Sequence, residues 1–149
     1  MSSTSSVITI KQALKAQLQA AIGATPTVYY SHPGAELGVE VIYLGDAREG
    51  EHEIPTLKAG RKRREESYVI PVVFEIAKPG TDASEAETRA FALFAYLENL
   101  LANTPGLGSA DATLRTRVRG WTSSCTFTES TRGWRCQLIV DMLVENRLT

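Results

Sequence analysis

The stretch Gly60–Ile76, GRKRREESYVIPVVFEI, contains the strand around which the rest of the fold is expected to form. It begins with a dense run of basic residues and ends in the clearest strand pattern of the chain. Every second residue from Tyr68 onward is apolar, which is typical of a strand that packs one face onto a core. The residues of this expected core face are Tyr68, Ile70, Val72, Phe74 and Ile76.

The opposite face of the same strand is mixed rather than polar, which predicts that it is also partly covered. It comprises Ser67, Val69, Pro71, Val73 and Glu75. Because Pro71 has no N–H to give to a ladder, we expect a sheet edge or a bulge at this point. An edge strand with a half-apolar outer face is a surface suited to a partner.

Length and composition place the chain among ordinary globular domains. Its 149 residues suffice for one domain with a proper core, 43% of them are hydrophobic, and the net charge is −1. A near-neutral balance argues against a dedicated nucleic-acid binder. We expect a disordered tail over residues 1–6 and a single domain over 7–149. No apolar run approaches the length of a membrane span and the start is polar, so we expect synthesis in a cytoplasm and no membrane partner.

The remaining elements follow from apolar periodicity and turn residues. A helix is expected from Thr9, with Gln12 completing a capping box, to a stop at Gly23. Two strands, 27–30 and 39–45, precede the Gly60–Ile76 stretch. A second helix with an acidic first turn runs to about Asn103. The resulting fold class is α+β: a mostly antiparallel sheet with both helices on one face.

The last part of the sequence predicts a long antiparallel hairpin. The parity of its apolar residues switches at Gly120, where a bulge would turn the strand over without ending it. Arg115, Arg117 and Arg119 alternate on one side, which favours a solvated sheet face. Cys125 and Cys136 fall opposite or nearly opposite each other. Without a secretory signal, two reduced thiols are favoured over a disulfide.

The segment 46–65 separates its charges into two arms. The first arm carries Asp46, Glu49, Glu51 and Glu53, and the second carries Lys58, Arg61, Lys62, Arg63 and Arg64. One interpretation is a solvated β-hairpin whose arms neutralise each other. The other is an arm that becomes ordered only against a neighbouring subunit. Phosphate binding by Arg61–Arg64 is a weaker third interpretation, because no aromatic residues are interleaved for base stacking.

No pattern in the sequence predicts catalysis. Two histidines, His32 and His52, and two hairpin cysteines do not make a tetrahedral metal site. Neither a phosphate-binding glycine loop nor a nucleophile elbow is present. We therefore expect no enzyme activity, no metal and no cofactor, and the charged arm with its apolar sheet face indicates assembly.

The sequence resembles the tail terminator (tail completion) proteins of phages with long non-contractile tails. The likeness is carried by VITIKQALKAQL, VEVIYLGDAR, GRKRREESYVIPVVFEIAKPG and TDASEAETRAFALFAYLENLL, and it covers nearly the whole chain. No single motif is diagnostic. The informative feature is the order: basic run, Glu-Glu, strand, Pro-Gly, and a helix that begins with acids.

This resemblance implies a ring, typically a hexamer, at the head-proximal end of the tail tube in the virion neck. Such a ring stops tube polymerisation and meets the head–neck connector or stopper protein, while genomic DNA passes through its lumen without sequence recognition. Assembly would take place in the host cytoplasm. The residues expected at a subunit or partner contact are Glu49, Glu51, Glu53, Arg61, Lys62, Arg63, Arg64, Val69, Val73, Ile139 and Leu143.

Two alternatives remain open at the level of the sequence. One is another neck component, such as a head-completion or stopper protein. The other is a small nucleic-acid-binding protein that works through Arg61–Arg64 and through Arg115, Arg117 and Arg119, whose binding would weaken steeply with salt.

Overall fold

The computed structural model describes residues 5–34, 39–53, 64–80, 82–108, 114–129 and 132–148, with the backbone alone for residues 52, 53, 64, 147 and 148. Its elements are α1 (Val7–Ile22), β1 (Val28–Tyr29), β2 (Glu40–Leu44), β3 (Arg48–Glu53), β4 (Arg64–Pro79), α2 (Ser84–Asn103), β5 (Arg115–Thr128) and β6 (Gly133–Leu148). The expected α+β class is confirmed. The strand added to the expected set is β3, from the first arm of the charged segment.

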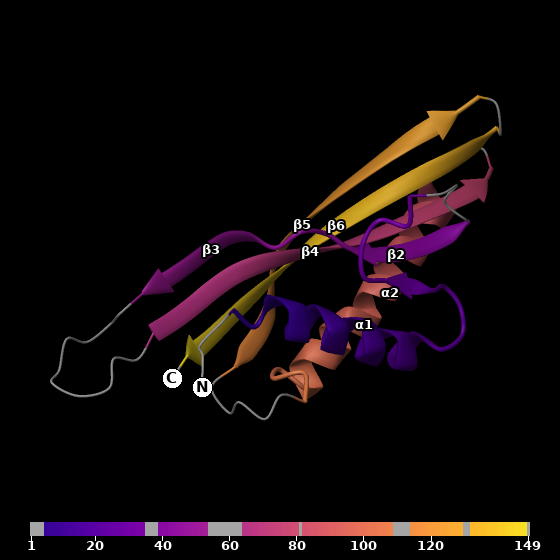
Figure 1. Cartoon of the computed structure of the whole chain (residues 1–149). Coiled ribbons are helices and arrows are strands. Elements are labelled where there is room, and N and C mark those ends of the chain that lie inside the picture. The colour runs from indigo at the N-terminus through magenta and orange to yellow at the C-terminus, as the bar shows by residue number, and fades with distance from the viewer. Residues whose placement is uncertain are drawn as a thin grey trace, which may run out of the picture.

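The strands form one twisted sheet in the order β1-β2-β4-β6-β5, and β3 pairs with β4 beyond the end of β2 (Figure 1). Every pairing is antiparallel except β1 with β2. Both helices contribute to one core with the even-numbered side chains of β4 and β6. The fold is therefore a two-layer sandwich, with the helices on one face of the sheet.

The strand β4 lies at the centre of the sheet, so the expectation of an edge at Pro71 is wrong. It pairs with β6 over its full length and with β2 and β3 on its other side. Pro71 lies where β2 has ended and β3 has not begun, and its carbonyl accepts a 2.7 Å hydrogen bond from Gly45 N. Since a strand residue points its nitrogen and its carbonyl to the same side, the missing N–H faces this gap and not β6.

The expected core face of β4 is confirmed. All five of its apolar side chains are buried at 2% exposure or less: Tyr68, Ile70, Val72, Phe74 and Ile76. They pack with the helix stripe Ile10, Leu14 and Leu18 on α1 and with the α2 stripe that includes Leu93 and Leu97. Each fully buried side chain of this size stabilises the fold by about 1.5–3 kcal/mol relative to exposure.

The first helix begins earlier than the sequence predicts. It starts at Val7 and ends before Gly23, and its N-cap residue Ser6 makes no side-chain cap of its own, so the Thr9–Gln12 capping box is wrong. A carboxylate from the sheet occupies that place: Glu66 Oε1 accepts hydrogen bonds from Ser6 N at 3.1 Å and from Ser6 Oγ at 2.9 Å. A negative group at a helix N-terminus is favourable. Of the expected tail, residues 1–4 lie outside the described residues.

The hairpin β5–β6 has the predicted bulge. Its register shifts between Val118 and Gly120, and Cys125 lies directly opposite Cys136. The two sulfurs form a disulfide, with the Cα atoms 4.1 Å apart. The expectation of reduced thiols is therefore wrong, because the register of the hairpin sets the two cysteines face to face within bridging distance.

Candidate assembly surfaces

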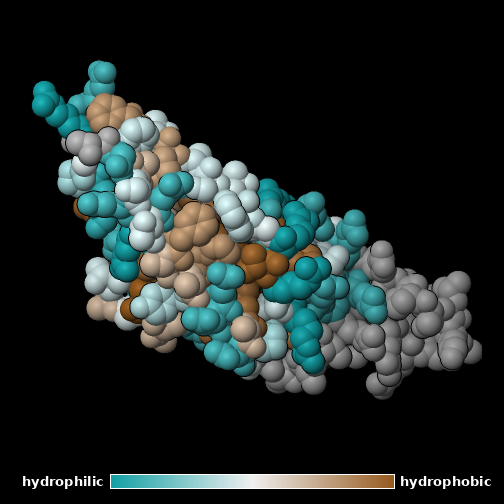
Figure 2. Space-filling view, turned by 180° about the vertical axis from the view of Figure 1, so that it is seen from behind, coloured by the Kyte–Doolittle hydropathy of each residue, from teal (hydrophilic) through white to brown (hydrophobic). Residues whose placement is uncertain are grey.

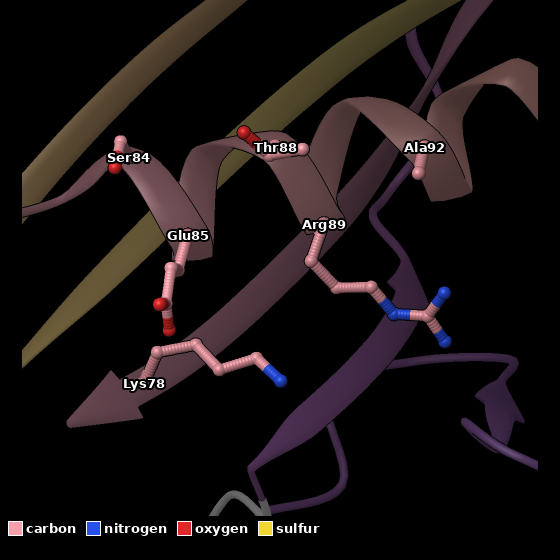
Figure 3. Close-up of a pocket in the computed structure, with 6 residues that line it drawn as sticks. All are labelled: Lys78, Ser84, Glu85, Thr88, Arg89 and Ala92. Atoms are coloured by element: carbon pink, nitrogen blue, oxygen red, sulfur yellow. The ribbon is translucent and has the colours of Figure 1, made fainter. Parts of the chain in front are cut away.

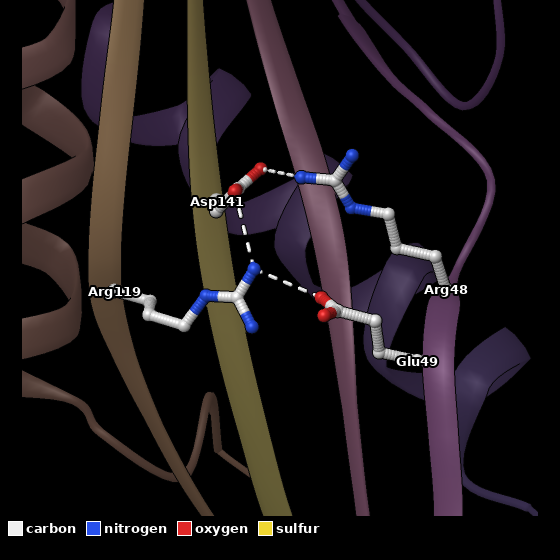
Figure 4. A network of polar contacts seen from close by, with 4 residues as sticks. All are labelled: Arg48, Glu49, Arg119 and Asp141. Carbon is white, nitrogen blue, oxygen red and sulfur yellow. Dashed lines mark hydrogen bonds and ion pairs between the residues drawn. The ribbon is translucent and has the colours of Figure 1, made fainter.

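A network of four charged side chains lies on the sheet face away from the helices (Figure 4). The Asp141 carboxylate on β6 accepts a hydrogen bond from Arg48 Nη2 at 2.5 Å and one from Arg119 Nη2 at 3.5 Å. Arg119 Nη2 also lies 2.8 Å from Glu49 Oε2. The pKa of Arg119 is raised, first by its hydrogen bond with Glu49. The network thus ties β3 to β5 across the two strands between them.

Irregularities in two strands place the ends of this network. The register of β3 shifts between Arg48 and Glu51, and Glu49 within it has a positive φ of 56°. The register of β5 shifts around Arg119. A bulge redirects the side chain of its extra residue. Each bulge directs a charged side chain, Glu49 in β3 and Arg119 in β5, over the same part of β4 and β6.

A second polar cluster surrounds Glu75, which is only 6% exposed on the same face. Its carboxylate accepts hydrogen bonds from Gln137 Nε2 at 2.8 Å, Tyr43 Oη at 3.2 Å and Arg135 Nη1 at 3.3 Å. Three donors satisfy a buried carboxylate, as burial of a charge requires. Burial, followed by the nearby Glu75 charge, raises the pKa of Tyr43. The outer face of the sheet is therefore covered by polar side chains of its own subunit.

The four apolar residues expected at a contact differ in how far they are exposed. Val69 and Val73 are 1% and 6% exposed in the single subunit, whereas Ile139 and Leu143 are half-buried. Any contact made by this face would meet Ile139, Leu143 and the polar side chains around them first. Val69 and Val73 are buried beneath that surface.

The expected charged contact residues are only partly described. Glu49 pairs with Arg119 of the same subunit, and Glu51 is exposed on β3 opposite Ser67. The backbones of Glu53 and Arg64 lie in β3 and β4, which confirms a hairpin at the base of the charged segment. Arg61, Lys62 and Arg63 lie outside the described residues.

The Glu66 cluster beneath α1 is a feature that sequence reasoning missed. Besides binding Ser6, it stands beside Tyr68, whose hydroxyl is 2.8 Å from Ser6 Oγ. Burial raises the pKa of Tyr68 well above its ordinary value, and the Glu66 charge adds to this effect. The signal in the sequence was Glu66 itself, an acid on the same face as the apolar residues Tyr68 to Ile76 and directly before them.

An open pocket lies between α2 and the end of β4, with a volume of about 410 Å³ (Figure 3). Lys78 and Arg89 extend toward it, and it is also lined by Ser84, Glu85, Thr88 and Ala92. Arg89 is held by Glu40 through two hydrogen bonds, at 2.6 Å and 3.2 Å. The guanidinium in this pocket is therefore already paired with a carboxylate.

The large exposed apolar side chains of the described residues come from several elements. They are Ile8, Tyr29, Val39, Tyr96, Trp121 and Phe127. The view from behind shows apolar side chains gathered in the middle of that side, between hydrophilic ones (Figure 2). Trp121 and Phe127 are notable because both belong to β5, the last strand at one side of the sheet.

Within the described ranges, no group of histidine, cysteine, aspartate or glutamate side chains could hold a metal ion. No helix among these residues is long and apolar enough to cross a membrane.

The architecture is that of a two-layer α+β domain with charged contacts on its open sheet face. Neither a family model nor a curated protein sequence matches the chain. Among solved structures, a chain from the virion of a native gene transfer agent particle is similar at 17% identity and a TM-score of 0.46. That similarity covers 92% of this chain and 95% of the other. A likeness of this degree carries no functional argument.

Proposed function

We propose that this protein is a structural component of a phage-like virion: a tail terminator that forms a ring of six copies on the head-proximal end of the tail tube. The observation that carries the proposal is the order of features from the basic run to the acid-capped helix, which resembles that of tail terminator proteins. The ring would stop tube growth and meet the connector or stopper protein of the neck.

The shape of the subunit supports a ring. A closed ring repeats one heterologous contact, so each subunit must offer two different surfaces. The described part of the chain is elongated: β3 and the start of β4 lie at one end, and the tip of the β5–β6 hairpin lies at the other (Figure 1). The first end is charged and the second carries Phe127 and Trp134, so the two ends differ in chemistry.

The charged arm is the part of the subunit that we assign to the ring contact. Surface charges away from special features change folding stability by about 0.5 kcal/mol or less. Loss of charge complementarity across a contact costs far more when the partner charges are left desolvated. Arg61, Arg63 and Arg64 of one copy would face acids of the next copy, and Glu49 and Glu51 are the exposed ones among the expected contact acids whose side chains the structure describes.

The test combines electron microscopy with polymerisation of the tube protein. The natural protein should form rings that cap tubes, and R61E/R63E/R64E should fold with an unchanged melting temperature but form no rings. The control K15E/R117E reverses two exposed charges outside the arm and outside the hairpin tip, and it should still cap tubes. A natural protein that binds DNA-filled heads and ignores tubes would favour the stopper alternative. Rings formed normally by R61E/R63E/R64E would refute the role of the arm.

A further inference from the structure

The upper half of β5, residues 121–128, is a sheet edge that lacks the features that normally prevent pairing with another strand. In the described sheet, β5 pairs only with β6, and residues 121–128, WTSSCTFT, contain neither a charge nor a proline. Natural edge strands are normally protected from pairing by charges, proline or a bulge. The lower half of β5 has that protection: three arginines, the bulge at Gly120, and Pro105 O bonded to Thr116 N at 2.8 Å.

The hydrogen-bonding groups of this upper half point outward. The Cα atoms of Cys125 and Cys136 are 4.1 Å apart, which is the short spacing of a non-hydrogen-bonded antiparallel pair. The N–H and C=O of Cys125 therefore point away from β6, and so do those of Trp121, Ser123 and Phe127. On the N-terminal side of the bulge, the N–H and C=O groups that point away from β6 belong to even-numbered residues, as the hydrogen bond from Thr116 N to Pro105 O shows. The bulge accounts for the change.

We propose that this edge pairs with the same edge of a second copy, antiparallel and about a two-fold axis at Ser124. In this register Trp121 of each copy lies opposite Phe127 of the other, in hydrogen-bonded pairs. A two-fold axis perpendicular to the sheet preserves its faces, and both aromatic rings lie on the helix side, Trp121 against Phe91 and Phe127 against Trp134. Aromatic pairs across antiparallel strands are stabilising.

The charge pattern favours a second copy of β5 over the β3 edge. The β3 edge carries Arg48, Glu49 and Glu51, which would set charges against the uncharged half of β5. Pairing of β5 with itself over residues 121–128 opposes no charges. Trp121 and Phe127 are 55% and 45% exposed in the single subunit and would be covered by this pairing. The disulfide holds the edge strand to β6 at the level of the contact.

This two-fold pair goes beyond the proposed ring, which repeats a different, heterologous contact. It gives the free protein a way to cover its open edge. Its subunits would meet through one surface used twice, so an even number of copies is the product.

Charge placed at the two-fold axis tests the pairing. Native mass spectrometry of the natural protein at micromolar concentration should show a dimer of two 16.3 kDa chains. S124K and S124E should each lose it, because like charges would lie opposite each other. An equimolar mixture of the two variants should regain a dimer of one chain of each kind. The control Q12K, at an exposed position on α1, should keep the dimer.

Each result decides the question. A natural protein without the dimer overturns the proposal, as does a dimer that survives in S124K, or a mixture that stays monomeric. Ring formation by S124K together with loss of its dimer would leave the ring proposal standing and support the separate two-fold contact. Failure of rings in every variant, with the dimer behaving as expected, would instead refute the proposed ring.

Discussion

Glu49 and Arg119 meet at 2.8 Å although two whole strands, β4 and β6, separate the strands on which they lie. Each residue is displaced from the regular ladder of its strand, and Asp141 lies between them as a shared acceptor for Arg119 and Arg48. The pair therefore couples the base of the charged arm to the opposite side of the sheet.

Removal of the Glu49 charge should loosen β3 more than it destabilises the whole domain. The side chains of Arg119 and Glu49 are 41% and 54% exposed, so E49Q should lower the free energy of unfolding only slightly. Amide exchange of residues 48–53 should nevertheless accelerate, because one anchor of the arm is lost. E145Q is the control, since Glu145 lies 3.9 Å from Arg117 in an exposed pair. Equal exchange in E49Q and the natural protein would mean that the network does not hold β3.

Gly45 should not tolerate a side chain. A Cβ at this position would lie 2.5 Å from Cγ of Pro71, in the gap between β2 and β3. G45A should lower the free energy of unfolding by about 1–3 kcal/mol, as overpacking generally does, measured by urea denaturation. G120A is the matched control, because a Cβ there meets nothing within 4 Å. If both variants unfold at the same urea concentration as the natural protein, the close approach of Gly45 to Pro71 is not a constraint.

Alkaline pH should destabilise the protein through Tyr68. Burial raises its folded-state pKa above the value of about 10 expected in the unfolded chain. The neutral phenol is thus the form that folding favours. Its contribution is complete below pH 10 and is lost as the pH rises through the folded pKa.

Urea denaturation at several pH values should show this loss of stability above pH 10. In Y68F the decline should be smaller, whereas Y29F removes an exposed tyrosine on β1 and should leave it unchanged. A decline of the same size in Y68F would show that other groups cause it.

The disulfide should be detectable in purified protein. Alkylation under denaturing conditions should label neither Cys125 nor Cys136 until a reductant is added, after which both should be labelled. Reduction should lower stability by about 2–4 kcal/mol, the usual effect of opening a bridge. C125S/C136S should match the reduced protein and no longer respond to reductant. Two labelled thiols before reduction would return the hairpin to the state that the sequence predicts.

The sequence predicted those parts of the fold that depend on local periodicity. The core face of β4, the α1 stripe and the change of parity at Gly120 are each visible within about ten residues, because a buried face imposes its period directly. The N-terminus of α1 could not be found this way, since Glu66 lies 60 residues from Ser6. The prediction of a sheet edge at Pro71 was wrong for the same reason. Its missing N–H leaves no hydrogen bond unmade only because β2 ends and β3 begins beside it.

For the candidate surfaces, the sequence indicated the charges but not their partners. Glu49 was expected to face the basic arm or a neighbouring subunit, yet it pairs with Arg119. That pair depends on two bulges and on the order of four strands, none of which one segment encodes alone. The opposite case is Ile139 and Leu143, whose outward parity on β6 was evident and whose half-burial agrees with it.

The position of β6 has a consequence for how the protein is made. This strand follows β5 in the sequence, yet it lies between β4 and β5 and pairs with β4 over sixteen positions, from Arg64 with Leu148 to Pro79 with Gly133. A nascent chain that has not yet emerged from the ribosome as far as residue 148 must therefore keep β4 without its main neighbour. Contacts so distant in sequence make folding slow. The sheet can therefore be completed, and the subunit can enter an assembly, only after residue 148 has emerged.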